Sequence, residues 1–334
     1  MDKERQLIKI IDKHMPRSEG QLNRLFESDS EMIPFPGGTM LFNIDDFSKE
    51  DLLQDDDPYV LGWNMAVGSI SDILASGGRP SYYAHSLVVQ DSWSAEYVDK
   101  LAQGIAAVLK ETSTAFIGGD LGVSPSFRYT GSVIGVLEGS PLLRSNAKMG
   151  DGLYVTGQIG LGNVEAAIGL YGGNQLIKQL TKSWKNMFQL RYKEAEIIKQ
   201  YSRCCIDTSD GVCNALKAIS EMSETGFIVG DLPYVGSGLL LAEALGIPKE
   251  LLFLGECGEY ELLFTLSRDS EEKFSKEAQE KSLSFWRIGE VTKQDTKLLR
   301  GNDKEIDLTS YALKARDYKD PKEYLREVIE FLKR

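Results

Sequence analysis

Some stretches of the chain carry apolar residues every three or four positions, as a helix does, and others carry the short apolar runs of a strand. These two kinds of stretch alternate along the chain, which predicts a layered α/β (α+β) protein. In the first half, the pattern predicts helices over 4–14, 60–76 and 95–111, and strands over 39–44, 82–89, 114–117 and 129–137. In the second half, it predicts helices over 162–171, 188–201, 212–221, 236–245 and 269–280, and strands over 153–156, 204–206, 226–229, 260–265 and 284–288. Turn chemistry over 147–151 separates the halves. We therefore predict domains at 1–143 and 144–316, followed by a helical tail at 317–334.

Composition and charge narrow the classes of function. The 334-residue chain has a formal net charge of −12, which argues against a nucleic-acid partner because the phosphates would be repelled. Nucleotides remain possible ligands where metal ions screen their phosphates. The sequence holds no apolar run of the roughly 20 residues that cross a bilayer, and its charged beginning is unlike a signal peptide. We therefore expect a cytoplasmic protein with no membrane partner.

The cysteines and histidines do not have the spacing of a zinc site or a catalytic triad. The chain has 4 cysteines and 2 histidines, and no Cys-x-x-Cys pair occurs among Cys204, Cys205, Cys213 and Cys257. We interpret these cysteines as small buried residues in a reducing compartment. With His14 and His85 as the only histidines, acid–base chemistry based on histidine is not a leading hypothesis.

Aspartates in separated motifs carry the strongest chemical signal. The sharpest motif is Ile206–Gly211, where an apolar stretch leads into Asp207 and Asp210 before a helix. The other motifs contain Asp29, Asp45, Asp72 and Asp120. Carboxylates brought together repel one another unless cations lie between them, and Mg²⁺ often bridges such carboxylates to substrate phosphates. Taken singly, Asp29 or Asp72 is more typical of a helix cap or an exposed acid. The acidic run 55–57 is typical of a solvated turn before a helix, and we do not assign it to the site.

Two glycine-rich segments are candidates for phosphate contacts. Gly118-Gly119-Asp120 follows a short apolar strand, and glycines let a backbone approach a ligand closely, with a plain turn as the alternative. The segment 157–162 lacks the spacing of a dinucleotide-binding turn, but amides before the helix at 162 are available to an anion. The sequence has no P-loop motif.

The order of these motifs resembles the thiamine-monophosphate kinase family, which shares a superfamily with aminoimidazole ribonucleotide synthetase. The resemblance runs from residue 4 to about residue 290. Its matches are Ser28–Ser30, Ile44-Asp45, Ser69–Asp72, Ala75–Pro80, Gly118–Asp120, Arg144–Gly157, Ile206–Gly211 and Gly258–Leu262. The chain departs from the family pattern at Ser28 and Ser30, which replace a glycine and an aspartate, and at Leu121 and Gly122, which replace two threonines.

The resemblance implies a two-domain protomer whose N-terminal mixed sheet forms a β-barrel across a homodimer. It implies ATP and Mg²⁺ as cofactors, a small phosphorylated acceptor, and the conversion of ATP and thiamine monophosphate into ADP and thiamine diphosphate. The implied metal ligands are Asp29, Asp45, Asp72, Asp120 and Asp210. The implied nucleotide contacts are Gly118, Gly119, Asp120, Arg144, Ser209 and Gly211, and the implied catalytic residues are Asp207, Asp210 and Arg191. A related ATP-dependent synthetase, a nucleotide-binding protein without turnover and an ordinary surface role for Arg191 remain open as alternatives.

Overall fold

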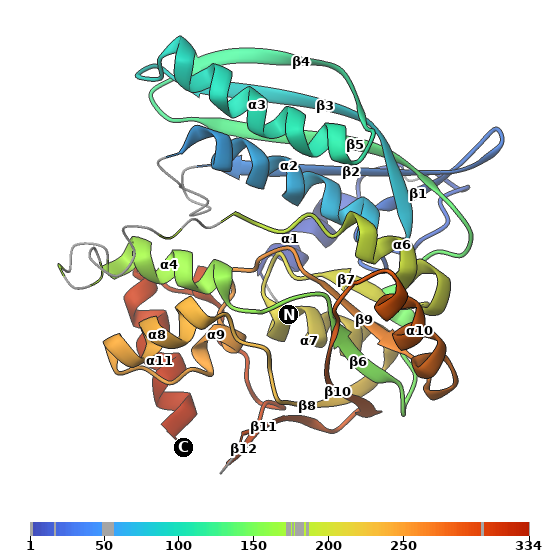
Figure 1. Ribbon diagram of the computed structural model, residues 1–334, viewed down its shortest axis with the longest axis vertical. Helices are drawn as coiled ribbons and strands as arrows, with labels where there is room; N and C mark the ends of the chain where they lie inside the picture. The colour runs from blue at the N-terminus through green and yellow to red at the C-terminus, as the bar shows by residue number, and fades with distance from the viewer. Residues whose placement is uncertain are drawn as a thin grey trace.

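The computed structural model describes residues 3–16, 18–48, 57–171, 175, 177, 184, 187–301 and 304–333. Within these residues the chain forms two mixed β-sheets with helices packed around them (Figure 1). The sheets come from successive parts of the chain, because the last strand of the first sheet ends at Leu137 and the first strand of the second begins at Gly152.

The first sheet has five strands in the order β1-β2-β5-β3-β4. They are β1 (Glu31–Phe35), β2 (Gly38–Ser48), β3 (Gly78–Gln90), β4 (Ala115–Ser124) and β5 (Arg128–Leu137). Strand β4 runs parallel to β3 at one edge, whereas the other neighbouring strands are antiparallel. Side chains alternate between the two faces of a strand, so Asn43 and Asp45 of β2 point to the covered face and Ile44 and Asp46 to the exposed face.

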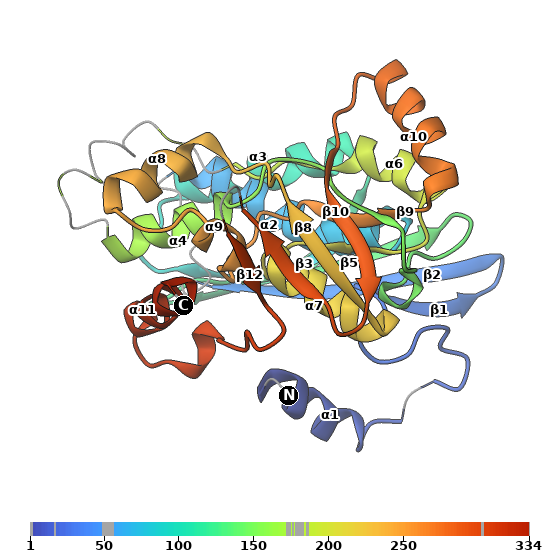
Figure 2. The same cartoon turned by 90° about the horizontal axis from the view of Figure 1, so that it is seen from below.

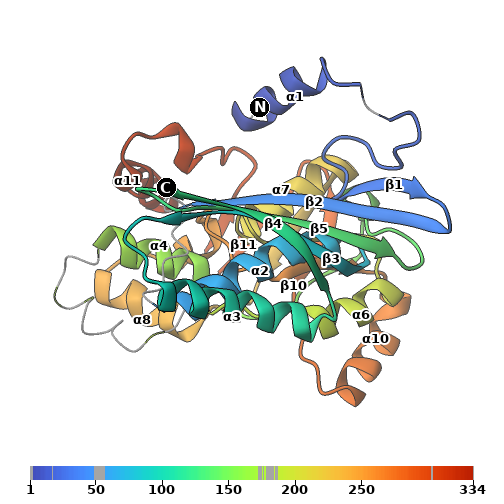
Figure 3. The ribbon, with the colours of Figure 1, turned by 90° about the horizontal axis from the view of Figure 1, so that it is seen from above.

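Two helices, α2 (Pro58–Ala75) and α3 (Ala95–Glu111), lie on the same side of this sheet (Figure 3). The Asp57 side chain caps α2 by accepting a hydrogen bond from the Tyr59 amide. Nearly every residue of α2 is buried, because the sheet covers one side of it and α3 another. Glycine is required where the helices meet, since a Cβ at Gly62 would lie 2.0 Å from the Leu101 carbonyl oxygen.

The second sheet has seven strands in the order β12-β11-β8-β10-β6-β9-β7. They are β6 (Gly152–Val155), β7 (Cys205–Asp207), β8 (Thr225–Gly230), β9 (Leu262–Leu266), β10 (Trp286–Lys293), β11 (Lys297–Arg300) and β12 (Glu305–Asp307). The accompanying helices are α4 (Leu161–Tyr171), α6 (Tyr192–Tyr201), α7 (Val212–Ser223), α8 (Gly236–Leu245), α9 (Leu251–Leu254), α10 (Arg268–Glu280) and α11 (Pro321–Lys333).

The two halves share one hydrophobic core. Buried side chains of α2 and the first sheet belong to the same cluster as Phe188, α6 and β9. The Trp63 indole donates to the Phe188 carbonyl oxygen at 2.8 Å, and the Phe188 amide donates to Asn64 Oδ1 at 2.9 Å. The C-terminal end of α2 also packs against β7. The halves are therefore held together by buried apolar surface as well as by the connecting chain.

The N-terminal helix α1 (Lys3–Asp12) is set apart from both sheets (Figure 2). Its Arg5 pairs with Glu221 of α7, and the guanidinium carbon lies 5.0 Å from the centre of the Phe26 ring. Among the described residues we find no helix with both the length and the apolar character that a bilayer crossing requires. All four cysteines are free, and three of them are buried.

Most predicted elements are present, and the errors have physical causes. The helices predicted at 95–111 and 236–245 have those bounds, and the tail contains α11. The prediction missed β1, and it ended the strand at 284–288 too early. Strand β10 continues through Gly289 to Lys293, and Gly289 pairs with Val229 of β8. The glycine is there because the two strands approach closely, since a Cβ would lie 2.0 Å from the Ile228 carbonyl oxygen, and it does not mark the end of the strand. The helix predicted from residue 188 begins only at Tyr192, after residues that pack into the shared core.

Candidate functional site

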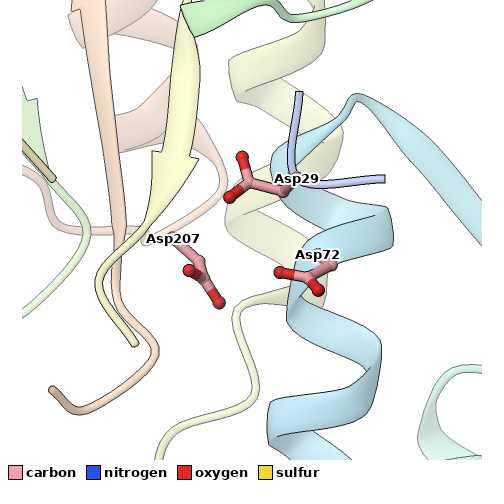
Figure 4. Close-up of side chains that lie close together, drawn as sticks. All are labelled: Asp29, Asp72 and Asp207. Carbon is pink, nitrogen blue, oxygen red and sulfur yellow. The ribbon is translucent and has the colours of Figure 1, made fainter. Parts of the chain in front are cut away.

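Four of the predicted aspartates converge where the two halves meet. Asp29 precedes β1, Asp45 lies on β2, Asp72 on α2, and Asp207 at the end of β7. Carboxylate oxygens of Asp29, Asp72 and Asp207 lie within 4.8 Å of one another, and the three side chains surround a common space (Figure 4). Asn43 connects Asp45 to this group, because its amide nitrogen donates to Asp72 Oδ2 at 2.9 Å and to Asp45 Oδ2 at 3.2 Å. We call Asp29, Asp45, Asp72 and Asp207 the aspartate cluster.

Burial and mutual repulsion make the cluster costly to ionise. Burial, followed by the charges of Asp207 and Asp29, raises the pKa of Asp45 to about 7. Burial and then Asp29 raise the pKa of Asp207 to about 6, against hydrogen bonds from Ser71 and Ser209. The pKa of Asp72 lies well above its ordinary value, first through burial and then through the neighbouring carboxylates. A cation placed among these groups would favour their ionised forms.

One guanidinium adjoins the cluster. Arg144 forms an ion pair with Asp29, whose side chain is 2% exposed. The second oxygen of Asp29, Oδ2, has no hydrogen-bond partner in the described part of the chain. One arginine does not balance four carboxylates, and the remaining donors are hard oxygen atoms. The residues therefore fit divalent cations that prefer carboxylate ligands, of which Mg²⁺ is the one usually found with phosphates.

A cavity of about 400 Å³ opens beside the cluster. Asp207 and Arg144 line it from the cluster side, and Ser209, Asp210, Lys217 and Lys314 line it further out. Ser209 and Asp210 are exposed, so both are accessible to a ligand in this cavity. Gly211, which begins the turn into α7, has a φ of 82°, and a Cβ there would lie 2.4 Å from the Gly255 carbonyl oxygen. Gly211 is thus required by the backbone that presents Ser209 and Asp210.

Asp120 does not join the cluster within one protomer. In the sheet, Asp120 pairs with Ser86, Ser86 with Thr130, and Thr130 with Asp46. Directly paired residues project from the same face, so Asp120 shares the exposed face of Asp46 and not the covered face of Asp45. The Thr130 hydroxyl donates to Asp46 Oδ1 at 2.8 Å, so the two side chains project from the same face of the sheet. Gly118 and Gly119 lie on β4 with Asp120, at the sheet edge.

Arg191, for which the family resemblance implies a catalytic role, lies outside the aspartate cluster. Its guanidinium forms hydrogen bonds with Glu261 and Glu194, and it lines a second cavity instead of the one beside the cluster. Sequence reasoning also missed Asn43. Its signal was available, because Asn43 and Asp45 are two residues apart on one strand and therefore face the same side.

Comparisons with known proteins agree with this geometry. Residues 28–137 match the family model described as AIR synthase related protein, N-terminal domain. The thiamine-monophosphate kinase of Pyrococcus abyssi is 30% identical over 219 residues, covering 65% of this chain and 68% of the relative. That of Bacillus subtilis is 29% identical, covering 78% and 81%. The enzyme of Buchnera aphidicola from Schizaphis graminum is 27% identical, covering 89% and 94%.

Solved structures share the fold. A structure named AaThiL complexed with AMPPCP and TMP superposes with a TM-score of 0.73 at 21% identity, covering 90% of this chain and 95% of that one. The hydrogenase maturation protein HypE of E. coli superposes with a TM-score of 0.66 at 17% identity, covering 90% and 95%. At these identities the superpositions establish the architecture, so the chemistry must be argued from the residues themselves.

Proposed function

The chain belongs to the thiamine-monophosphate kinase family, and from this membership we propose that it transfers the terminal phosphoryl group of ATP to thiamine monophosphate. The observation that carries the proposal is the aspartate cluster, in which the buried Asp207 and three half-buried aspartates, drawn from both halves of the chain, adjoin one guanidinium among the described residues. In this reaction the bond from the γ-phosphorus of ATP to its bridging oxygen breaks. A phosphate oxygen of thiamine monophosphate forms the new bond, which yields ADP and thiamine diphosphate.

The cluster residues would hold Mg²⁺, which supplies positive charge between the phosphates of the two substrates. Arg144 orients Asp29 and lines the adjoining cavity, where it adds a fixed positive charge at the phosphates. Ser209 and Asp210 lie along the same cavity and are available to the nucleotide or to a further cation. The acceptor phosphate is already ionised, so the transfer requires no histidine base.

We further propose that the active enzyme is a cytoplasmic homodimer formed through the exposed face and edge of the first sheet. At the edge, strand β4 leaves Leu121 66% and Val123 69% exposed, and on the exposed face Ile44 of β2 is 60% exposed, which is an unusual amount of apolar surface for a free sheet. In this dimer, Asp120 and its neighbours Gly118 and Gly119 would contribute to a site only together with the partner subunit. A β-barrel across the interface is the form of this dimer that the family resemblance implies.

Mass spectrometry of the products tests the activity. Incubation with Mg²⁺, ATP and thiamine monophosphate is expected to yield equal amounts of ADP and thiamine diphosphate, whereas unphosphorylated thiamine yields no such product. ATP that binds without turnover of thiamine monophosphate would contradict the proposed reaction and favour a nucleotide-binding protein. Light scattering tests the dimer separately, because a particle of 37.1 kDa, the mass of one chain, would refute it.

A further inference from the structure

The second half of the chain holds another cavity, of about 690 Å³, which the proposed reaction does not use. Its polar end is formed by Arg191 and the three acids Glu194, Glu259 and Glu261. None of these residues lines the cavity beside the aspartate cluster. The volume lies within the range of small-molecule sites in proteins.

The arginine of this cavity is already paired with two acids. Arg191 Nε and Nη2 donate to the two carboxylate oxygens of Glu261, each at 2.6 Å, and Nη1 donates to Glu194 at 2.8 Å. Gly157 allows this approach, since a Cβ there would lie 2.1 Å from Arg191 Nη2. Each guanidinium nitrogen donates to a carboxylate, so three of the five N–H groups of Arg191 are used by Glu261 and Glu194. The acids outnumber the arginine, so the polar end does not favour an anion.

Among the described residues, no lysine or arginine forms an ion pair with Glu259. The side chain is 3% exposed, and its Oε2 accepts a hydrogen bond from the Gly160 amide at 3.0 Å, just before α4 begins. Its Oε1 has no hydrogen-bond partner among the described residues. Burial, and then the charge of Glu261, raise the pKa of Glu259 to about 8. The amides before α4, which the sequence left available to an external anion, are therefore occupied by this carboxyl group.

The rest of the cavity offers apolar and aromatic surface. Met187 and Leu283 line it, and the Trp286 ring at its rim is 44% exposed. An indole face attracts a cation more strongly than other aromatic side chains do. We propose that this cavity binds an organic cation, an ammonium or amidinium group on an aromatic or apolar body, with the charged group directed to Glu259.

The full-length chain can be titrated with benzamidine while tryptophan fluorescence is followed, with benzamide as the neutral probe of nearly the same shape. We expect saturable binding of benzamidine and at least about tenfold weaker binding of benzamide, because only the cation compensates a buried carboxylate. Glu259→Gln is expected to remove this preference. Trp286→Ala changes a residue at the rim and is expected to weaken benzamidine binding while the fold is retained.

Asp72→Asn tests whether benzamidine binds in this cavity or at the aspartate cluster. If it binds in this cavity, the substitution should leave benzamidine affinity unchanged. Equal affinity for benzamidine and benzamide would overturn the proposal, as would unchanged affinity in Trp286→Ala. Loss of benzamidine binding in Asp72→Asn would overturn it too, because the cation would then be held by the cluster. These outcomes do not depend on phosphoryl transfer, which is measured separately by product formation.

Discussion

The aspartate cluster and the Arg191 ion pairs are two groups of buried carboxylates in one chain, and they are neutralised differently. Around Arg191, the protein supplies the cation itself, and the side chains of Arg191 and Glu261 are 16% and 4% exposed. In the cluster, Asp29 alone is paired with an arginine, while burial raises the pKa values of Asp45, Asp72 and Asp207. A buried acid with an internal partner is explained by the fold, whereas acids gathered without one indicate an external cation.

The largest expected effect is on stability, at the internally neutralised group. Arg191→Met should lower the free energy of unfolding by about 3–5 kcal/mol, because it leaves the carboxylates of Glu261 and Glu194 without their cation. Chemical denaturation measures this. The matched control is Arg300→Met in the second sheet, whose ion pair with Glu305 has side chains that are 55% and 56% exposed. The control should cost less than about 1 kcal/mol. Equal losses in the free energy of unfolding in the two variants would show that the buried ion pairs of Arg191 stabilise the protein no more than an exposed pair does.

The next effect is on catalysis, at the cluster. Asp72→Asn should lower kcat/KM for thiamine monophosphate by about 10²–10³-fold, since it removes charge that holds cations against the phosphates. The metal-free variant should not be less stable than the parent, because it carries one repelling carboxylate fewer. Asp99→Asn, on the exposed surface of α3, is the matched control and should retain activity. A stable Asp72→Asn enzyme with undiminished turnover would show that the reaction does not require the aspartate cluster.

The effect of pH on the metal-free protein should come third. Raised folded-state pKa values mean that the folded protein holds protons that the unfolded chain has released. Stability in EDTA should therefore fall as pH rises through about 6 and about 7, the pKa values of Asp207 and Asp45. The loss between pH 5 and pH 8 should be on the order of 4 kcal/mol, because the proton on Asp207 is released about one pH unit above the start of this interval and the proton on Asp45 about two. Mg²⁺ should reduce it, because a bound cation favours ionisation. A melting temperature in EDTA that rises over this interval would contradict the assignment.

The smallest effect should come from Asn43. Asn43→Ala removes the amide that donates to both Asp45 and Asp72, and we expect about a tenfold lower kcat/KM. Because Asn43 positions ligands without binding phosphate itself, the loss should appear as a higher Mg²⁺ requirement. Asn146→Ala is the control, because the half-buried Asn146 side chain donates to the Arg203 carbonyl oxygen and not to the cluster. A variant that keeps the parent Mg²⁺ dependence would leave Asn43 with a purely structural role.

The convergence of the cluster could be predicted from sequence because each motif adjoins a strand end or a helix in the order of a known family. The face occupied by Asp120 could not. A register shift between Tyr83 and Ala84 leaves Ile117 as an extra residue of β4. One extra residue reverses the alternation of every later side chain, so Asp120 points to the exposed face. The local mark of this bulge is Gly118, which follows Ile117 with a φ of 135°, but from the sequence we interpreted the glycine pair as a phosphate contact or a plain turn.

The partners of Arg191 were also beyond sequence reasoning. Glu261 is 70 positions away along the chain, and its approach depends on the pairing of β7 with β9. The sequence therefore allowed a catalytic role implied by the family position, or an ordinary surface role. The folded chain adds that Arg191 is largely buried and paired with Glu261 and Glu194.

The core that joins Trp63 to Phe188 has a consequence for how the aspartate cluster would bind a cation. The carboxylates of the cluster come from both sides of this joint, and packed apolar side chains resist being pulled apart. The spacing of the ligands is therefore fixed before nucleotide arrives, and hinge closure is not needed to assemble them. A rigid frame of this kind selects cations by size, and the two halves should melt together in a single calorimetric transition.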